Sequence, residues 1–228
     1  MADLELSTHL RNLFNILDIQ CVLDVGANKG QYRDFLRAHV GYKGLILSFE
    51  PASSLSESLI ERSKTDPNWK IFPFALGSMD TELTFNVMAT TQFSSFLTPD
   101  HSVVLDFTDK NIIDHKETVP VRQLDSLMDE LKLNWPMNNI FLKLDTQGFD
   151  LEVIKGSEKT LGGIKALQSE VSILRIYAGM PDFMTSLNVF NENGFDISGM
   201  FVVSRDQHLR AIEFDAVMIN RKDIQSAT

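Results

Sequence analysis

The sequence is short of cysteine and of basic residues. Its single cysteine, Cys21, has no partner for an internal disulfide and supplies no cysteine-based zinc site, which favours a reducing compartment. The 21 Lys and Arg residues are outnumbered by 31 Asp and Glu residues and form no basic cluster. A net charge of −10 suits neither nucleic acid nor an anionic membrane surface, because both attract clustered positive charge.

Long apolar runs are also missing. No segment approaches the roughly 18 residues of a transmembrane helix, so we expect no membrane insertion. Asp3 and Glu5 stand where a signal peptide would carry basic residues. These absences together predict a cytoplasmic location.

What remains is the composition of an ordinary globular protein. The chain has 228 residues, of which 43% are hydrophobic and 23% are charged, so it can bury a core without a metal or a disulfide. No linker or internal repeat divides it. We therefore expect a single domain over residues 1–228.

Helix and strand patterns alternate along most of the chain. Apolar residues at three- and four-residue spacing over residues 1–20 predict an N-terminal helix, which Ser7 or Thr8 could cap. Short runs that are apolar on both faces alternate with helical segments, which predicts a doubly wound, mostly parallel α/β sheet. The runs expected to be strands are 21–25, 44–49, 70–74, 140–145 and 166–171.

Two other segments depart from this alternation. The last two predicted strands, 196–204 and 212–219, are joined by a short turn and predict an antiparallel hairpin. Residues 89–118 have no clear period, and a segment of that length is either an inserted lid or a sign of elements that the pattern does not reveal.

The first predicted strand ends in the turn Asp24-Val25-Gly26-Ala27-Asn28-Lys29-Gly30. Ligands of open α/β sheets bind beyond the carboxyl ends of the strands, where glycines allow close approach and helix N–H groups attract anions. Glu50 ends the second strand, where a carboxylate can accept both hydroxyl hydrogens of a ribose. A nucleoside-bearing cofactor is therefore expected.

The spacing of the turn favours one cofactor over another. In the dinucleotide pattern G-x-G-x-x-G, the second and third glycine positions are occupied here by Asn28 and Gln31, and the phosphate-binding G-x-x-x-x-G-K-[ST] pattern is absent. A turn of this kind suits the methionine end of S-adenosylmethionine better than a pyrophosphate. Asp24 would hold either the turn or the cofactor's ammonium group.

A second group of polar residues follows the strand 140–145. Lys143 and Asp145 are expected on one face of that strand, and Gln168 and Glu170 on one face of a later strand. Buried charges are costly unless they are paired, so a Lys143–Glu170 ion pair is one interpretation, with Asp145 capping the next helix. The other interpretation places Asp145 beside a transferred methyl group.

At this point the sequence resembles a known family. The segments VLDVGANKG, FEP, ALG, LKLDTQGFDLEVIKG and FDAVMINR are similar to those of the FkbM family of S-adenosylmethionine-dependent methyltransferases. The resemblance implies a class I methyltransferase fold, Rossmann-like, with a seven-stranded sheet and an antiparallel last strand. The chain departs from the family pattern at Thr146-Gln147, where a Glu is usual, and at Phe74, where an Asn is common.

The resemblance also implies a set of site residues. The cofactor-binding positions that it implies are Asp24, Gly26, Asn28, Gly30, Glu50, Pro51, Ala75, Leu76, Ser94, Ser95 and Asp145. The implied reaction is O-methylation of a hydroxyl group on a carbohydrate or natural-product acceptor, a small molecule or a glycan. No sequence feature indicates an oligomeric state.

The catalytic residues are a further prediction. An alcohol acceptor loses its proton during transfer, and the candidates for the base are Asp145, His101 and His115, with Lys143 orienting the acceptor or balancing Glu170. Scattered histidines and the lack of an H-E-x-x-H pattern predict no metal. Two alternatives stay open, namely an NAD-linked oxidoreductase on a Rossmann-like fold and a catalytically silent, methyltransferase-like binding subunit.

Overall fold

A seven-stranded sheet forms the centre of the computed structural model, which describes residues 2–104, 107–135 and 137–225. Its strand order is β3-β2-β1-β7-β8-β10-β9. All neighbouring pairs are parallel except those of β10, which is antiparallel to both β8 and β9. This confirms the predicted mostly parallel sheet with an antiparallel last strand. The strands are β1 Cys21–Val25, β2 Leu45–Phe49, β3 Trp69–Phe72, β7 Ile140–Leu144, β8 Ile164–Ser172, β9 Phe195–Arg205 and β10 Ala211–Asn220.

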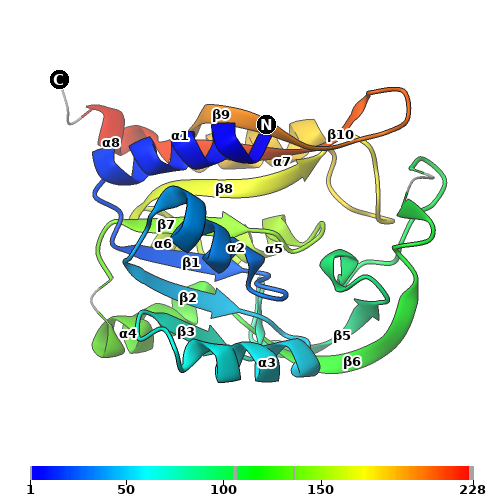
Figure 1. Cartoon of the computed structure of the whole chain (residues 1–228), viewed down its shortest axis with the longest axis horizontal. Helices are drawn as coiled ribbons and strands as arrows, with labels where there is room; N and C mark the ends of the chain where they lie inside the picture. The colour runs from blue at the N-terminus through cyan, green and yellow to red at the C-terminus, as the bar shows by residue number, and fades with distance from the viewer. Residues whose placement is uncertain (1, 105–106, 136, 226–228) are drawn as a thin grey trace.

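Helices cover both faces of this sheet, as the strands that are apolar on both sides require (Figure 1). Alternate residues of β1 illustrate the division, since Val22 belongs to the core under α1 and Leu23 to the core under α4. The order reverses between β1 and β7, which leaves a crevice at the carboxyl ends of these strands. The helices are α1 Ala2–Ile16, α2 Gln31–Phe35, α3 Ser53–Ser63, α4 Leu124–Asn134, α5 Asp150–Lys155, α6 Glu158–Leu161, α7 Phe183–Glu192 and α8 Arg221–Gln225.

Two helices differ from the sequence prediction. The helix α1 already includes Ala2, so Ser7 and Thr8 lie inside it and donate to the Leu4 carbonyl oxygen at 3.1 and 2.8 Å instead of capping it. The helical segment expected between the strands 21–25 and 44–49 is α2 followed by a π-helical turn, η1, over Leu36–Val40. No described helix is long and apolar enough to span a bilayer.

The predicted lid is only partly irregular. Its last residues, 113–118, belong to strand β6 (Ile113–Arg122), which pairs with β5 (Thr81–Met88) and β4 (Ala75–Leu76) in a separate three-stranded sheet. The segment 89–112 carries the short 3-10 helix η2 (Thr91–Phe93) and lies at the carboxyl end of the main sheet (Figure 1). The prediction missed β6 because its charged residues hide the alternation. Two residues of the predicted lid, 105 and 106, lie outside the described part of the chain.

Candidate active site

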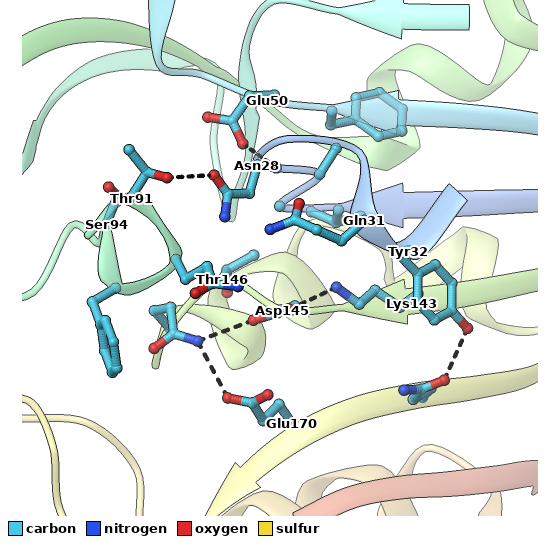
Figure 2. A pocket seen from close by; sticks show the side chains of 18 of the residues that line it. Asn28, Gln31, Tyr32, Glu50, Thr91, Ser94, Lys143, Asp145, Thr146 and Glu170 are labelled. Atoms are coloured by element: carbon cyan, nitrogen blue, oxygen red, sulfur yellow. Dashed lines mark hydrogen bonds and ion pairs between the residues drawn. The ribbon is translucent and has the colours of Figure 1, made fainter. Parts of the chain in front are cut away.

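A cavity of about 870 Å³ lies at the carboxyl ends of β1, β2, β7 and β8. Its size is within the range of small-molecule sites. The predicted site residues that line it are Gly26, Asn28, Glu50, Pro51, Ala75, Leu76, Ser94, Lys143 and Asp145. Figure 2 shows labelled side chains from the β1 turn, η2, β7 and β8 facing a common space.

The turn after β1 contacts the ends of both β2 and β7. The Gly26 and Ala27 amides donate to the Phe49 carbonyl oxygen at 3.0 and 3.1 Å. A Cβ on Gly26 would lie 2.0 Å from the Asp145 carbonyl oxygen, and the Gly26 φ of +84° is also unfavourable for other residues. Gly30, which has a φ of +80°, precedes α2 and does not line the cavity. Glycine at 26 therefore sets how closely the two loops approach.

Asn28 links this turn to two other elements. Its backbone adopts a left-handed φ of 47°. Its amide N–H donates to Glu50 Oε2 at 2.7 Å, and its side-chain Oδ1 accepts from the Thr91 hydroxyl of η2 at 2.8 Å (Figure 2). Ser94, three residues further along, accepts from the Met88 amide at 3.1 Å. Asn28 thus joins the β1 turn to β2 and to η2.

Glu50 is almost completely buried at the end of β2. Its two carboxylate oxygens accept from the backbone amides of Asn28 at 2.7 Å and of Ala52 at 2.9 Å. Burial raises the pKa of Glu50 to about 7, against the effect of these two hydrogen bonds. Each oxygen keeps a second lone pair, so the carboxylate can accept further hydrogen bonds from the cavity.

Asp24 does not line the cavity. It is fully buried under α2, where Oδ2 accepts from the Ser48 hydroxyl at 2.8 Å and Ser48 in turn accepts from the Trp69 indole at 2.9 Å. Its Oδ1 has no hydrogen-bond partner and lies 3.9 Å from Lys143 Nζ. Asp24 therefore balances Lys143 in the interior, and the prediction that it contacts a cofactor ammonium group gains no support.

Lys143 pairs with carboxylates on its own side of the sheet. Its Nζ lies 2.7 Å from Asp145 Oδ2, and it stands above the Tyr32 ring (Figure 2). Burial alone would lower the pKa of Lys143, but Asp145 and Asp24 outweigh it and raise that pKa. The predicted Lys143–Glu170 pair is wrong, because the register places Lys143 opposite Asp24 and Gln168, and Glu170 two residues further along β8.

Gln147 connects Asp145 to Glu170. Its backbone is left-handed, with a φ of 53°, and its Nε2 donates to Asp145 Oδ1 at 3.0 Å and to Glu170 Oε1 at 3.2 Å (Figure 2). Ser95 donates to the Gln147 carbonyl oxygen at 2.7 Å, and the Tyr177 hydroxyl lies 3.0 Å from Gln147 Oε1. Ser95 is fully buried and does not line the cavity.

The cap of α5 also differs from the prediction. Its N-cap residue is Phe149, and no side-chain hydrogen bond caps the helix there. The carboxylate of Asp150 accepts from the Thr146 amide at 2.9 Å and from the Ser169 hydroxyl at 2.5 Å, outside the helix. The side chain of Asp145 contacts Lys143, which gives the buried ammonium a counter-charge.

The two predicted histidine bases lie away from the cavity. His101 is within 3.3 Å of the Asn111 carbonyl oxygen. His115 is on β6, half-exposed, where hydrogen bonds to Asp114 and Glu117 raise its pKa. Neither residue lines the cavity, so the geometry gives no support to a catalytic role for either.

The aromatic residues of the 89–112 segment both line the cavity and pack against other rings. Phe93, Phe96 and Phe107 line the cavity. The rings of Phe93 and Phe107 also pack against each other, with centroids 5.0 Å apart. The ring of Phe96 packs against Phe149, the N-cap residue of α5, with centroids 4.6 Å apart. Phe74, which replaces a common Asn, joins a cluster with Phe49 and does not reach the cavity.

Sequence reasoning missed the far end of the cavity. Glu170 of β8 and Glu213 and Asp215 of β10 line this acidic end, together with Gln168 and Ser204. The signal was present, because Glu213 and Asp215 alternate with apolar neighbours in a strand that had been predicted. Only the pairing of Glu170 with Asp215 across β8 and β10 brings these carboxyl groups together.

No arrangement of three or more His, Cys, Asp or Glu side chains suited to a metal ion occurs within residues 2–104, 107–135 and 137–225. The acidic end offers carboxyl groups without the geometry of a metal site. Absence of a metal stays a prediction.

Strand order, the glycine turn and the buried acid after β2 define the class I fold of S-adenosylmethionine-dependent methyltransferases. The Methyltransferase FkbM domain matches residues 24–197, and the chain belongs to that family. Its cofactor is therefore S-adenosylmethionine. Membership of a methyltransferase family leaves the NAD-linked alternative without support.

Solved structures share the fold. Methyltransferase FkbM from Methylobacillus flagellatus KT aligns with a TM-score of 0.56 and 14% identity, over 87% of this chain and 44% of that one. The METTL16 MTase domain aligns with a TM-score of 0.52 and 10% identity, over 97% of this chain and 69% of that one. This chain thus spans less than half the length of the M. flagellatus protein. No curated protein matches it in sequence.

Proposed function

We propose that this chain transfers the methyl group of S-adenosylmethionine to a hydroxyl oxygen of a small acceptor, a carbohydrate or another natural product. One observation carries the proposal: the β1 turn and Glu50 line the same continuous cavity as Asp145 and the polar residues of β8 and β10. A donor at one end and an acceptor at the other would therefore meet beside Asp145.

The cofactor end of the cavity fits the donor in shape and chemistry. At Gly26 any side chain would collide with the Asp145 carbonyl oxygen, so glycine there lets the β1 turn and Asp145 line one cavity side by side. Glu50 offers free lone pairs for two ribose hydroxyls, and Pro51 lies beside it. Further apolar and small residues here are Ala75, Leu76 and Ser94. When bound, S-adenosylmethionine supplies a methyl group activated by its sulfonium.

Asp145 is the residue we assign to the acceptor. Its side chain is 30% exposed, while Lys143 and Gln147 fix both of its oxygens. A carboxylate fixed in this way can accept a hydrogen bond from an acceptor hydroxyl and draw its proton away as the new bond forms. Lys143 is a positioning residue, since it contacts Asp145 and is itself largely buried.

We also propose where the protein is located and how many domains it has. The net negative charge and the lone, buried Cys21 support a cytoplasmic protein without nucleic-acid partners. Both ends of the cavity draw on the same sheet, which supports one domain over residues 1–228.

Calorimetry with S-adenosylhomocysteine and NAD, followed by a mass-spectrometric screen of hydroxylated acceptors, tests the proposal. We expect binding of S-adenosylhomocysteine only, and one or more methylated products. Asp145→Asn is expected to lower turnover more than affinity for S-adenosylhomocysteine. Tight binding without any product would favour the silent binding subunit, and equal losses of turnover and affinity would assign Asp145 to the cofactor.

A further inference from the structure

The acidic end of the cavity, formed by Gln168, Glu170, Ser204, Glu213 and Asp215, carries carboxyl groups without a matching cation. Among the described residues that line the cavity, Lys143 is the one Lys or Arg, and Asp145 and Asp24 already balance it. No described basic residue lies within ion-pair distance of Glu170, Glu213 or Asp215. The excess of carboxyl groups over basic groups is therefore located where an acceptor would bind.

The other cavity carboxylates are satisfied by the protein itself. Asp34 pairs with Arg33 and Arg62 at 2.9 and 2.8 Å. Glu50 accepts two backbone amides, as described above. The carboxyl groups of the acidic end also accept hydrogen bonds, from Gln147, Ser204 and Gln168, but these donors carry no charge. Because three carboxyl groups lie together there, the imbalance of charge is local and does not simply reflect the acidity of the chain.

The carboxyl groups of the acidic end are close together and poorly hydrated. Glu213 is 5% exposed and accepts from the Ser204 hydroxyl at 2.8 Å, and it also interacts directly with Glu170. Asp215 stands opposite Glu170 in the β8–β10 pairing. Carboxylates in such proximity cannot all be ionised at low cost, so protons occupy the place of a missing cation.

The titration of these groups agrees with that geometry. Burial and the neighbouring Glu213 raise the pKa of Glu170 well above its ordinary value, and burial raises the pKa of Asp215 to about 6. The groups that face them are Asp145 and Gln147 from the β7–α5 connection, Lys143 from β7, Tyr32 from α2 and Tyr177 from the segment after β8. Of these, Lys143 alone is cationic.

The cavity also has an apolar lining, formed by Leu6 of α1, Phe35 of α2, Ala38 of η1 and Val203 of β9. A ligand that filled the cavity would therefore meet both carboxyl groups and hydrocarbon. This combination suits an amine on an apolar body better than an uncharged polyol.

We infer that the acceptor of this chain bears an ammonium group, which the carboxylates of Glu170, Glu213 and Asp215 bind at the acidic end of the cavity. This inference rests on the proposed function, because it names the acceptor class for the same cavity. The ammonium takes the place of the protons that the carboxyl groups otherwise share, so its binding releases protons.

Three matched phenols test this inference in full-length protein saturated with S-adenosylhomocysteine. Tyramine carries an ammonium group, 4-ethylphenol is neutral and 3-(4-hydroxyphenyl)propionate is anionic. Calorimetry is expected to give tyramine an affinity at least about tenfold higher than that of 4-ethylphenol, the effect of one partly buried charge pair, with the propionate weakest. Repeating the calorimetry near pH 6 in buffers of different ionisation enthalpy shows whether protons are released on binding. We expect proton release when tyramine binds and none when either of the other two phenols binds.

Variants locate the effect. Glu213→Gln and, independently, Asp215→Asn are expected to reduce the preference for tyramine at least about threefold, whereas Glu192→Gln on the exposed face of α7 leaves it unchanged. Equal affinity for tyramine and 4-ethylphenol, or binding of none of the three phenols, overturns the inference. Failure of the wild-type protein to bind S-adenosylhomocysteine, measured first, would instead overturn the proposed function.

Discussion

Gly26 and Asp145 approach each other so closely that a Cβ on Gly26 would lie 2.0 Å from the Asp145 carbonyl oxygen. The two residues end neighbouring strands, β1 and β7, on the two sides of the point where strand order reverses. The Asp145 amide also donates to the Val25 carbonyl oxygen at 3.0 Å. The floor of the cavity therefore depends on a backbone contact that only glycine permits.

Gly26→Ala is expected to destabilise the protein and to weaken binding of S-adenosylhomocysteine, because the loops after β1 and β7 must separate. Gly41→Ala is the matched control, since Gly41 has a similar φ of +79° but no atom within 4 Å of the added Cβ. The control is expected to cost about 1–2 kcal/mol for its backbone conformation. Gly26→Ala should cost roughly 1–3 kcal/mol more. Equal melting temperatures would contradict the close approach.

Lys143→Met is expected to lower the free energy of unfolding by about 3–5 kcal/mol, because the carboxylates of Asp24 and Asp145 lose their buried cation. Lys155→Met provides the comparison, since Lys155 forms an exposed ion pair with Glu152 at 2.5 Å. Such surface pairs contribute about 0–1 kcal/mol. Urea unfolding at pH 7 measures both. Similar losses in the two variants would mean that Lys143 does not serve as the counter-charge of Asp24.

Glu50→Ala is expected to weaken affinity for S-adenosylhomocysteine by about 1–3 kcal/mol, the scale of losing hydrogen bonds to a charged group. Part of this loss comes from the Asn28 turn, which Glu50 holds through the Asn28 amide. Glu61→Ala on α3, at an exposed carboxylate, is the control and should bind as the wild type does. Calorimetry measures the affinity of both variants for S-adenosylhomocysteine. An unchanged affinity in Glu50→Ala would contradict the assignment of Glu50 to the ribose.

The buried carboxyl of Glu50 predicts a pH dependence of stability. Its pKa is raised from 4.5 to about 7, so between these values the folded state binds more protons than the unfolded state. Stability from this group is fully present below about pH 4.5 and is lost as the pH rises through 7. The loss is about 3 kcal/mol.

Glu50→Gln should flatten this part of the pH profile, whatever its effect on stability at one pH. Denaturant unfolding of the wild type and the variant at half-unit intervals between about pH 5 and 8 gives the two slopes. Parallel profiles would show that another group accounts for the dependence.

The sequence predicted the order of the elements well, because that information is local. The apolar run 21–25, the turn at Gly26 and the alternation after it identify a strand, a loop and a helix without reference to distant residues. The seven-stranded sheet with its antiparallel β10 is confirmed. Strand β6 was missed because the charged and polar residues of its first half, Asp114 to Thr118, show no apolar period.

The partners of buried charges could not be predicted in the same way. One interpretation paired Lys143 with Glu170, yet the register of β7 with β8 places Lys143 opposite Gln168, and its ion pair is with Asp145. A shift of two residues in the pairing of β7 with β8 would place Glu170 opposite Lys143, and the apolar pattern of either strand would stay the same.

The sequence by itself determined the alternation of strands and helices, the glycine turn and the acid at the end of β2, since each depends on neighbours within a few residues. Tertiary structure alone decided that Asp24 lies beneath the cavity, that Gln147 joins Asp145 to Glu170, and that β8 and β10 bring three carboxyl groups together. The reason is that register and sheet order fix which side chains meet across strands, and these long-range pairings have no period in the chain.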